Sequence, residues 1–171
     1  MISVFLSKLL TSRQASFTEE NINIFDLFFA MQPIKSIVEL QVDIEKKYND
    51  EELVTNFGRK ISDAMLDHFK TRFGMKGEQL KSIWINMLGL SGLGKLELVN
   101  MDKDSAMFQT NSSTIAKMYL NEFGKQKKPV CSIICGMLES YIKEITGKQA
   151  KCKETSCMAA GQKQCVFEIS F

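Results

Sequence analysis

The clearest pattern of apolar and polar positions lies in the middle of the chain. Across residues 50–74 apolar side chains recur at three- and four-residue spacing, which predicts one long helix whose inward face is Leu53, Phe57, Ile61, Ala64, Met65 and Phe69. Pro33 opens an earlier apolar stripe that ends near Asn49, and residues 78–90 carry another before a glycine cluster. The pattern therefore predicts three successive helices.

Three other stretches have the composition and alternation typical of strands. Residues 2–10 and 16–29, rich in Phe, Ile, Val and Leu, predict an N-terminal hairpin around a polar break. Residues 95–110 alternate on either side of a polar turn and predict a second hairpin. The tail, residues 149–171, predicts two strands joined by a turn at 159–161.

Two further helices are expected between the last two hairpins, a short one around 115–123 and one over 129–146. The second is apolar on more than one side, so we expect it to be buried. The pattern as a whole predicts an α+β fold with an antiparallel sheet packed against several helices. A chain of 171 residues with 44% hydrophobic content is expected to form a single domain, 1–171, with the N-terminal hairpin and helix in 1–50 and the core in 51–171.

The charge balance and the absence of long apolar runs limit the partners and the location that the sequence suggests. Twenty-two basic and twenty acidic residues leave a formal charge of +2, which argues against a nucleic-acid partner. No apolar run approaches the roughly 18 residues of a membrane-spanning helix. The first residues show neither a basic leader nor a small-residue cleavage site. We therefore expect a cytoplasmic protein with no membrane span.

All five cysteines lie between residues 131 and 165. An odd number in a reducing compartment argues against a disulfide framework and directs attention to a metal. Structural zinc takes four ligands, chiefly thiolate, imidazole and carboxylate. Glu154 and Cys157 can reach one ion if the chain turns at 155–156, and Cys165 returns on the next strand. Cys131, near the start of the buried helix, is the natural fourth ligand, because a helix N-terminus stabilises a thiolate.

Two other cysteines compete for this zinc site. Cys135 is one helical turn beyond Cys131, and Cys152 shares a strand face with Glu154. A different interpretation treats all five as small buried hydrophobic residues, since free cysteine is among the most buried residue types.

The spacing of the tail resembles that of the 4-vinyl reductase domain family, with its E-x-x-C, a glycine and then C-x-F. The matching residues are Glu154, Cys157, Gly161, Cys165 and Phe167, preceded by a helix with Cys131 and Gly136 five residues apart. The whole chain is similar to stand-alone archaeal members. The resemblance implies a structural zinc held by Cys131, Glu154, Cys157 and Cys165, binding or sensing of a small hydrophobic molecule such as a hydrocarbon, and a homodimer.

Four aromatic residues are candidates to line an apolar ligand cavity: Trp84, Phe108, Tyr119 and Phe73. The competing interpretation of each is ordinary core packing. The ligand-binding histidine and tryptophan of the phenol sensors in this family have no counterpart at matching spacing, so the resemblance does not imply phenol itself.

No catalytic residues are predicted, because four protein ligands leave zinc no open position for water. Two alternatives stay open, a dimeric interaction scaffold similar to vesicle-tethering subunits, and a zinc-dependent hydrolase if Glu154 moves off the metal.

Overall fold

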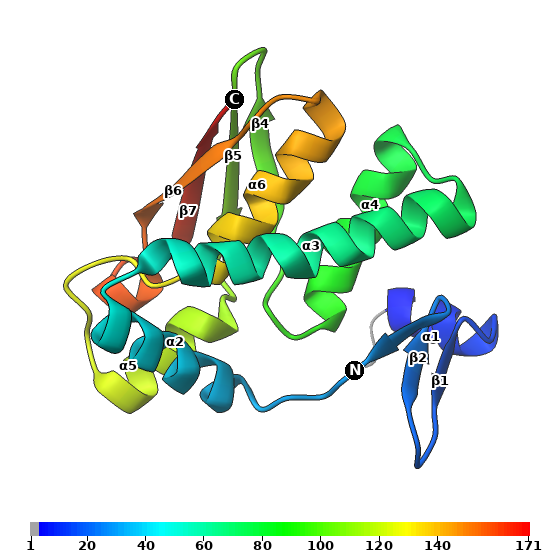
Figure 1. Ribbon diagram of the computed structural model, residues 1–171, viewed down its shortest axis with the longest axis horizontal. Coiled ribbons are helices and arrows are strands. Elements are labelled where there is room, and N and C mark those ends of the chain that lie inside the picture. Colours follow the sequence, from blue (N-terminus) through cyan, green and yellow to red (C-terminus); the bar gives the residue numbers. More distant parts are fainter. Residues whose placement is uncertain (1–3) are drawn as a thin grey trace. The chain divides into compact units, whose positions relative to one another are not determined.

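A computed structural model describes residues 4–171 (Figure 1), and the chain divides into two compact units, Met1–Pro33 and Ile34–Phe171. The smaller unit contains a helix and a three-stranded antiparallel sheet in the order β1-β2-β3. Its elements are α1 (Val4–Thr11), β1 (Ala15–Phe17), β2 (Ile22–Ile24) and β3 (Leu27–Phe29).

The helix α1 occupies most of the segment for which the pattern predicted a strand. Residues 2 and 3 of that predicted strand lie outside the described residues, and residues 4–11 are helical. A short apolar run does not separate strand from helix, and leucine and lysine favour the helix. The polar break ends it, because the hydroxyls of Thr11 and Ser12 donate to the carbonyl oxygens of Ser7 and Lys8 at 3.0 and 2.7 Å. Only the second half of the predicted hairpin is extended.

The larger unit contains five helices and a four-stranded antiparallel sheet, in the order β4-β5-β7-β6, within the part of the chain that is described. Its elements are α2 (Ile34–Tyr48), α3 (Glu51–Phe73), α4 (Gly77–Leu90), β4 (Glu97–Met101), β5 (Ser105–Thr110), α5 (Thr114–Phe123), α6 (Ser132–Thr146), β6 (Lys151–Ser156), the 3-10 turn η1 (Met158–Ala160) and β7 (Cys165–Ser170). The predicted α+β class with antiparallel sheets is therefore confirmed. No helix of residues 4–171 is long and apolar enough to cross a membrane.

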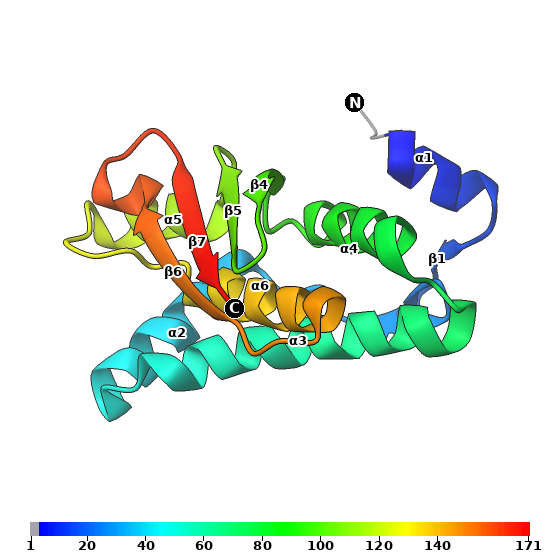
Figure 2. The same ribbon diagram turned by 90° about the horizontal axis from the view of Figure 1, so that it is seen from above.

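Helix α6 lies between the sheet and α3, as the two views in Figures 1 and 2 agree. Every residue from Ser132 to Ile142 is buried, which explains why this helix is apolar on more than one side. It begins after Cys131 and ends at Gly147, whose φ of 73° is the left-handed conformation that glycine adopts readily. The sheet and α3 thus fix the axis of α6 from opposite sides.

The face that α3 turns toward α6 is made of small side chains. Thr55, Gly58 and Ser62 are buried, whereas Leu53 and Phe57, predicted to point inward, are 45% and 48% exposed. A Cβ on Gly58 would overlap the carbonyl oxygen of Ile133. The two backbones therefore touch where they cross, and this close approach turns Leu53 and Phe57 outward. Further along α3, Met65 and Phe69 are buried as predicted, whereas Ala64 is exposed.

Candidate metal centre

A β-bulge in β6 brings Glu154 and Cys157 to one side of the strand. Glu154 lies opposite Phe167 and Ser156 opposite Val166, so Thr155 is an extra residue without a partner on β7. Without it, a spacing of three would send the two side chains to opposite faces. The sequence predicted a turn at this point, and the bulge produces the same convergence while the strand continues.

Cys131 is the residue that precedes the first turn of α6. Its backbone N–H donates to Glu154 Oε2 at 2.8 Å, which joins the helix start directly to β6. Helix α2 supports the preceding residue, because Gln41 Nε2 donates to the carbonyl oxygen of Val130 at 2.9 Å. The position of the helix start is therefore set by both α2 and the hairpin.

Within residues 4–171, one group of cysteine and carboxylate side chains is arranged so that it could hold a metal ion. Cys131, Glu154, Cys157 and Cys165 are all buried, and their ligand atoms lie within 4.8 Å of one another. The sulfurs of Cys131 and Cys165 are 3.9 Å apart. Tetrahedral zinc with Zn–S bonds of about 2.3 Å separates two sulfurs by about 3.8 Å, so this spacing fits such an ion.

The polar atoms around the cluster also fit a metal. Oε1 of Glu154 is buried and accepts no hydrogen bond, although Oε2 has the partner described above. The backbone N–H of Met158 donates to the sulfur of Cys165 at 3.4 Å, and the hydroxyl of Ser113 lies 3.4 Å from the sulfur of Cys131. Donors of this kind orient and stabilise thiolate ligands. The donor set therefore leaves one carboxylate oxygen with room for a cation.

Burial and mutual contact shift the proton affinities of the cluster in opposite directions. Burial, followed by the nearby charge of Cys157, raises the pKa of Glu154 to about 7. Hydrogen bonds from the thiols of Cys131 and Cys165 lower the pKa of Cys157, and the same contact with Cys157 raises the pKa of Cys131. Without metal, the four groups therefore share protons rather than all carrying charge, and a dication would replace those protons.

Cys135 and Cys152, the two alternative ligands, do not join this cluster. Their sulfurs lie 3.0 Å from each other, between α6 and β6. The five cysteines thus form one group of three with Glu154 and one separate pair.

Two of the four aromatic candidates, Trp84 and Phe108, pack against Tyr141 in the core. The rings of Trp84 and Tyr141 are stacked with centroids 4.3 Å apart, and Phe108 meets Tyr141 edge-on at 6.2 Å. Trp84 Nε1 donates to Ser62 Oγ at 2.9 Å. The hydroxyl of Tyr141 is buried with no hydrogen-bond partner. We call Trp84, Phe108 and Tyr141 the aromatic cluster.

The other two candidates have different surroundings. Tyr119 packs against Phe123 of the same helix with ring centroids 5.8 Å apart, and burial together with the carboxylate of Glu45 raises its pKa. Phe73 lies at the end of α3, is 39% exposed and contacts the rings of His68 and Phe69.

Sequence reasoning missed the buried ion pair that joins α3 to α6. Glu139 is buried, and its Oε2 accepts from Arg59 Nε and Nη2 at 2.6 Å each. Its Oε1 accepts from the backbone N–H of Cys152 at 2.9 Å. The available signal was an acidic residue on an otherwise apolar helix, which has to find a partner when it is buried.

The comparison with protein families covers the C-terminal third of the chain. Residues 116–171 match the V4R domain. The C-terminal third of the chain is therefore similar to a V4R domain. The matched segment includes α6 and the whole β6 and β7 hairpin, and so contains all four residues of the candidate metal centre. A sequence search of curated proteins finds no match.

Solved structures share the fold of this chain at low sequence identity. The phenol-responsive sensory domain of the transcription activator PoxR, solved with phenol, has a TM-score of 0.76 at 15% identity, covering 99% of this chain and 91% of that one. A vinyl-4-reductase family protein from Methanocaldococcus jannaschii has 0.55 at 18%, covering 99% and 96%. A trafficking protein particle complex subunit 3 from Naegleria fowleri, covalently bound to palmitic acid, has 0.56 at 15%, covering 80% and 93%.

Proposed function

We propose that this chain binds a small, largely apolar molecule, and that a structural zinc ion held by Cys131, Glu154, Cys157 and Cys165 fixes its C-terminal hairpin against α6. One observation carries the ligand part of the proposal. The hydroxyl of Tyr141 is buried beside Trp84 and Phe108 without a hydrogen-bond partner. Buried polar groups in native proteins are almost always paired, so this hydroxyl needs a water or a polar group of a ligand.

The fold comparison supports the same proposal. The PoxR sensory domain was solved with phenol, and the Naegleria subunit carries palmitic acid, so two proteins of this fold hold a small or apolar molecule. An aromatic ligand with one hydrogen-bonding group would match both the ring faces of the aromatic cluster and the hydroxyl of Tyr141. We therefore place the ligand beside these three residues.

Trp84 makes the ligand proposal directly testable, because it is the only tryptophan in the chain. Titration with phenol and with toluene, followed by tryptophan fluorescence, should give saturable changes. Tyr141→Phe keeps the ring and removes the hydroxyl, so it should weaken phenol binding by about fivefold, from a hydrogen bond of about 1 kcal/mol, and leave toluene unchanged.

Tyr48→Phe is the control, since it removes the hydroxyl of a tyrosine that is 58% exposed and lies outside the aromatic cluster. It should leave the affinity for both compounds unchanged. Native mass spectrometry of the purified protein adds a second measurement, because a bound organic molecule appears as added mass. The absence of any saturable response together with the absence of added mass would contradict the ligand proposal.

Metal analysis tests the zinc part. Cys157→Ser and Cys165→Ser should each lose the metal and loosen the hairpin, because three ligands and a hydroxyl hold zinc poorly. Cys135→Ser should keep one zinc per chain, since its sulfur lies in the separate pair with Cys152. Equal metal content in the wild type and in Cys157→Ser would refute the assignment.

A homodimer stays a second prediction, favoured by large apolar side chains left exposed on three helices. Leu40 on α2, Phe57 on α3 and Leu120 on α5 are 55%, 48% and 42% exposed. Paired subunits would remove such surface from water. The same native mass spectra give the number of subunits, and a monomer at micromolar concentration would contradict the predicted homodimer.

The cytoplasmic location also stays a prediction.

A further inference from the structure

The pair formed by Cys135 and Cys152 has no part in the metal centre. Cys135 lies in the first turn of α6 and Cys152 near the start of β6, and both are free thiols. Their sulfurs are 3.0 Å apart although the residues are separated by 17 positions. A disulfide bond is about 2.05 Å long, so closing it requires a shift of about 1 Å.

The backbone around the pair is held in place from three elements. Glu139, one turn beyond Cys135, accepts from the backbone N–H of Cys152 at 2.9 Å. The same carboxylate is fixed by Arg59 of α3. Hydrogen bonds that do not involve sulfur therefore hold the two cysteines opposite each other. Their backbone positions should be the same whether the sulfurs are reduced or oxidised.

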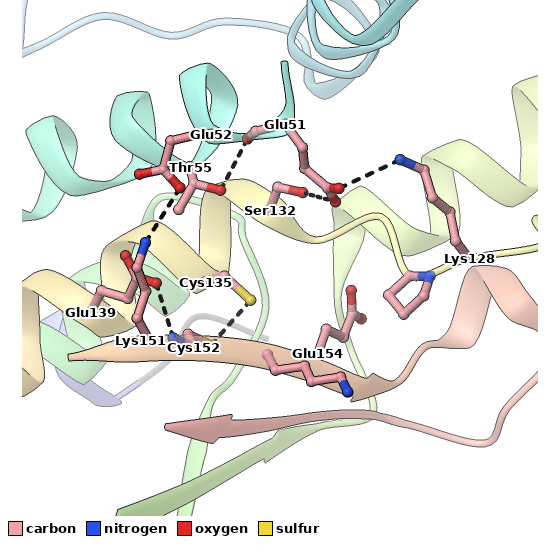
Figure 3. A pocket seen from close by; sticks show the side chains of 12 residues that line it. Glu51, Glu52, Thr55, Lys128, Ser132, Cys135, Glu139, Lys151, Cys152 and Glu154 are labelled. Atoms are coloured by element: carbon pink, nitrogen blue, oxygen red, sulfur yellow. Dashed lines mark hydrogen bonds and ion pairs between the residues drawn. The ribbon is translucent and has the colours of Figure 1, made fainter. Parts of the chain in front are cut away.

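The pair can also be reached from solvent through Cys152, although Cys135 is buried. Cys135 and Cys152 both line a pocket of about 420 Å³ between the start of α3, the start of α6 and β6 (Figure 3). Cys152 is partly exposed, and the pocket wall carries Lys128, Lys151 and Lys153 beside the carboxylates of Glu51 and Glu52. A small polar oxidant can enter a pocket of this size and polarity.

We propose that Cys135 and Cys152 form a reversible disulfide when the protein meets a hydroperoxide. The sulfur of one thiol attacks a peroxide oxygen, the O–O bond breaks, and a sulfenic acid and one water form when the oxidant is hydrogen peroxide. The second thiol attacks that sulfur, the S–O bond breaks, and a second water leaves with the remaining proton. Two thiols lose two electrons and two protons, and the peroxide is reduced to two waters.

The bond would join α6 to β6, the same two elements that Cys131 and Glu154 join at the metal centre. It is a second cross-link beside the zinc site, independent of whether zinc is present. The inference therefore does not depend on the proposed function, and its test can fail or succeed separately.

The experiment uses the full chain as purified, reduced and then freed of reductant, and treats it with one equivalent of hydrogen peroxide. Thiols counted after denaturation should fall by two, from five to three, and dithiothreitol should restore all five. Mass spectrometry of the digested protein, with fragmentation of the linked peptides, should identify a bond between Cys135 and Cys152. The metal content should be the same before and after treatment.

Two variants sharpen the test. Cys135→Ser and Cys152→Ser each start with four thiols and should give no linked peptide through the remaining thiol of the pair, because the second step lacks its partner. The variant that retains the attacking thiol should stop at a sulfenic acid, which dimedone traps as added mass. If either variant fails to fold, the linked peptide in the wild type decides the matter alone. A link through Cys131, Cys157 or Cys165, a single sulfur oxidised to sulfinic acid without a link, or an unchanged count of five would each overturn the proposal.

Discussion

Replacing Gly136 with alanine tests whether α3 and α6 touch through their backbones. The added Cβ would overlap the carbonyl oxygen of Thr55, and it would lie 2.8 Å from the carbonyl carbon of Thr55 and 2.9 Å from the backbone nitrogen of Arg59. All three atoms belong to the backbone of α3, so rotating a side chain cannot relieve the overlap. The helices have to move apart or bend.

The expected cost follows from two opposing effects. Overpacking a rigid core destabilises by about 1–3 kcal/mol, and we take the upper end because the obstructing atoms are backbone. Alanine in place of glycine inside a helix returns about 1 kcal/mol. Gly136→Ala should therefore lower the free energy of unfolding by about 2 kcal/mol. Gly58→Ala, where the added Cβ would overlap the carbonyl oxygen of Ile133, should change it in the same direction.

Gly89 gives the matched control, because it lies in α4 and has no heavy atom within 4 Å of the added Cβ. Gly89→Ala should gain about 0.5–1 kcal/mol from helix propensity alone. Urea unfolding followed by circular dichroism measures both changes, and an unchanged denaturant slope shows that only stability has changed. If Gly136→Ala were as stable as Gly89→Ala, the close contact of the two helices would be refuted.

Three further predictions concern charges and metal. Arg59→Met should lower the free energy of unfolding by about 3 kcal/mol, because it leaves the buried Glu139 carboxylate unpaired. Adding Glu139→Gln should restore part of that loss, because no buried charge is then left unpaired. Urea unfolding measures both changes. If zinc occupies the proposed centre, its removal with a chelator should speed hydrogen exchange in β6 and β7 and leave α3 unchanged, whereas equal exchange everywhere would argue against a local metal link. In the metal-free protein the pKa of Glu154 is about 7 in the folded state and near 4.3 in the unfolded state. Protonated Glu154 should therefore contribute to the stability of the fold below about pH 4.3, and this contribution should be lost as the pH rises toward 7. Glu154→Gln should lack that pH dependence of the unfolding free energy.

The sequence predicted those elements best whose positions follow from one requirement, such as burying an apolar face. The helices α2 to α6 and the last strand, β7, follow apolar periodicity, because each has a face that is removed from water. The meeting of Cys131, Glu154, Cys157 and Cys165 was also predicted, since their spacing suits a tetrahedral ion.

Other features depend on contacts that a linear pattern does not contain. Residues 4–11 carry an apolar run that fits a strand or a helix equally well, and local hydrogen bonds from Thr11 and Ser12 favour the helix. Leu53 and Phe57 have helical spacing, yet the small residues Thr55 and Gly58 face α6, because the two helix backbones touch where they cross. Tyr141 was not singled out, because a tyrosine in an apolar helix shows its missing partner only when its neighbours are known.

The metal centre, the cysteine pair and the hydrogen bond from Cys152 to Glu139 form a single seam between α6 and β6. On α6 the residues that take part, Cys131, Cys135 and Glu139, recur every four positions, which is a rise of about 6.0 Å per step. On β6 they are Glu154 and Cys152, two residues and about 6.6 Å apart. The two repeats nearly match, so a helix stripe at four-residue spacing can lie against one face of a strand and meet it at two successive steps. The partners run in opposite directions, Cys131 with Glu154 and Cys135 with Cys152, and Glu139 then binds the backbone of Cys152. Fixing any one of these contacts sets the register of the others. Zinc at one end of the seam, or a disulfide in its middle, would thereby hold the same alignment of helix and hairpin.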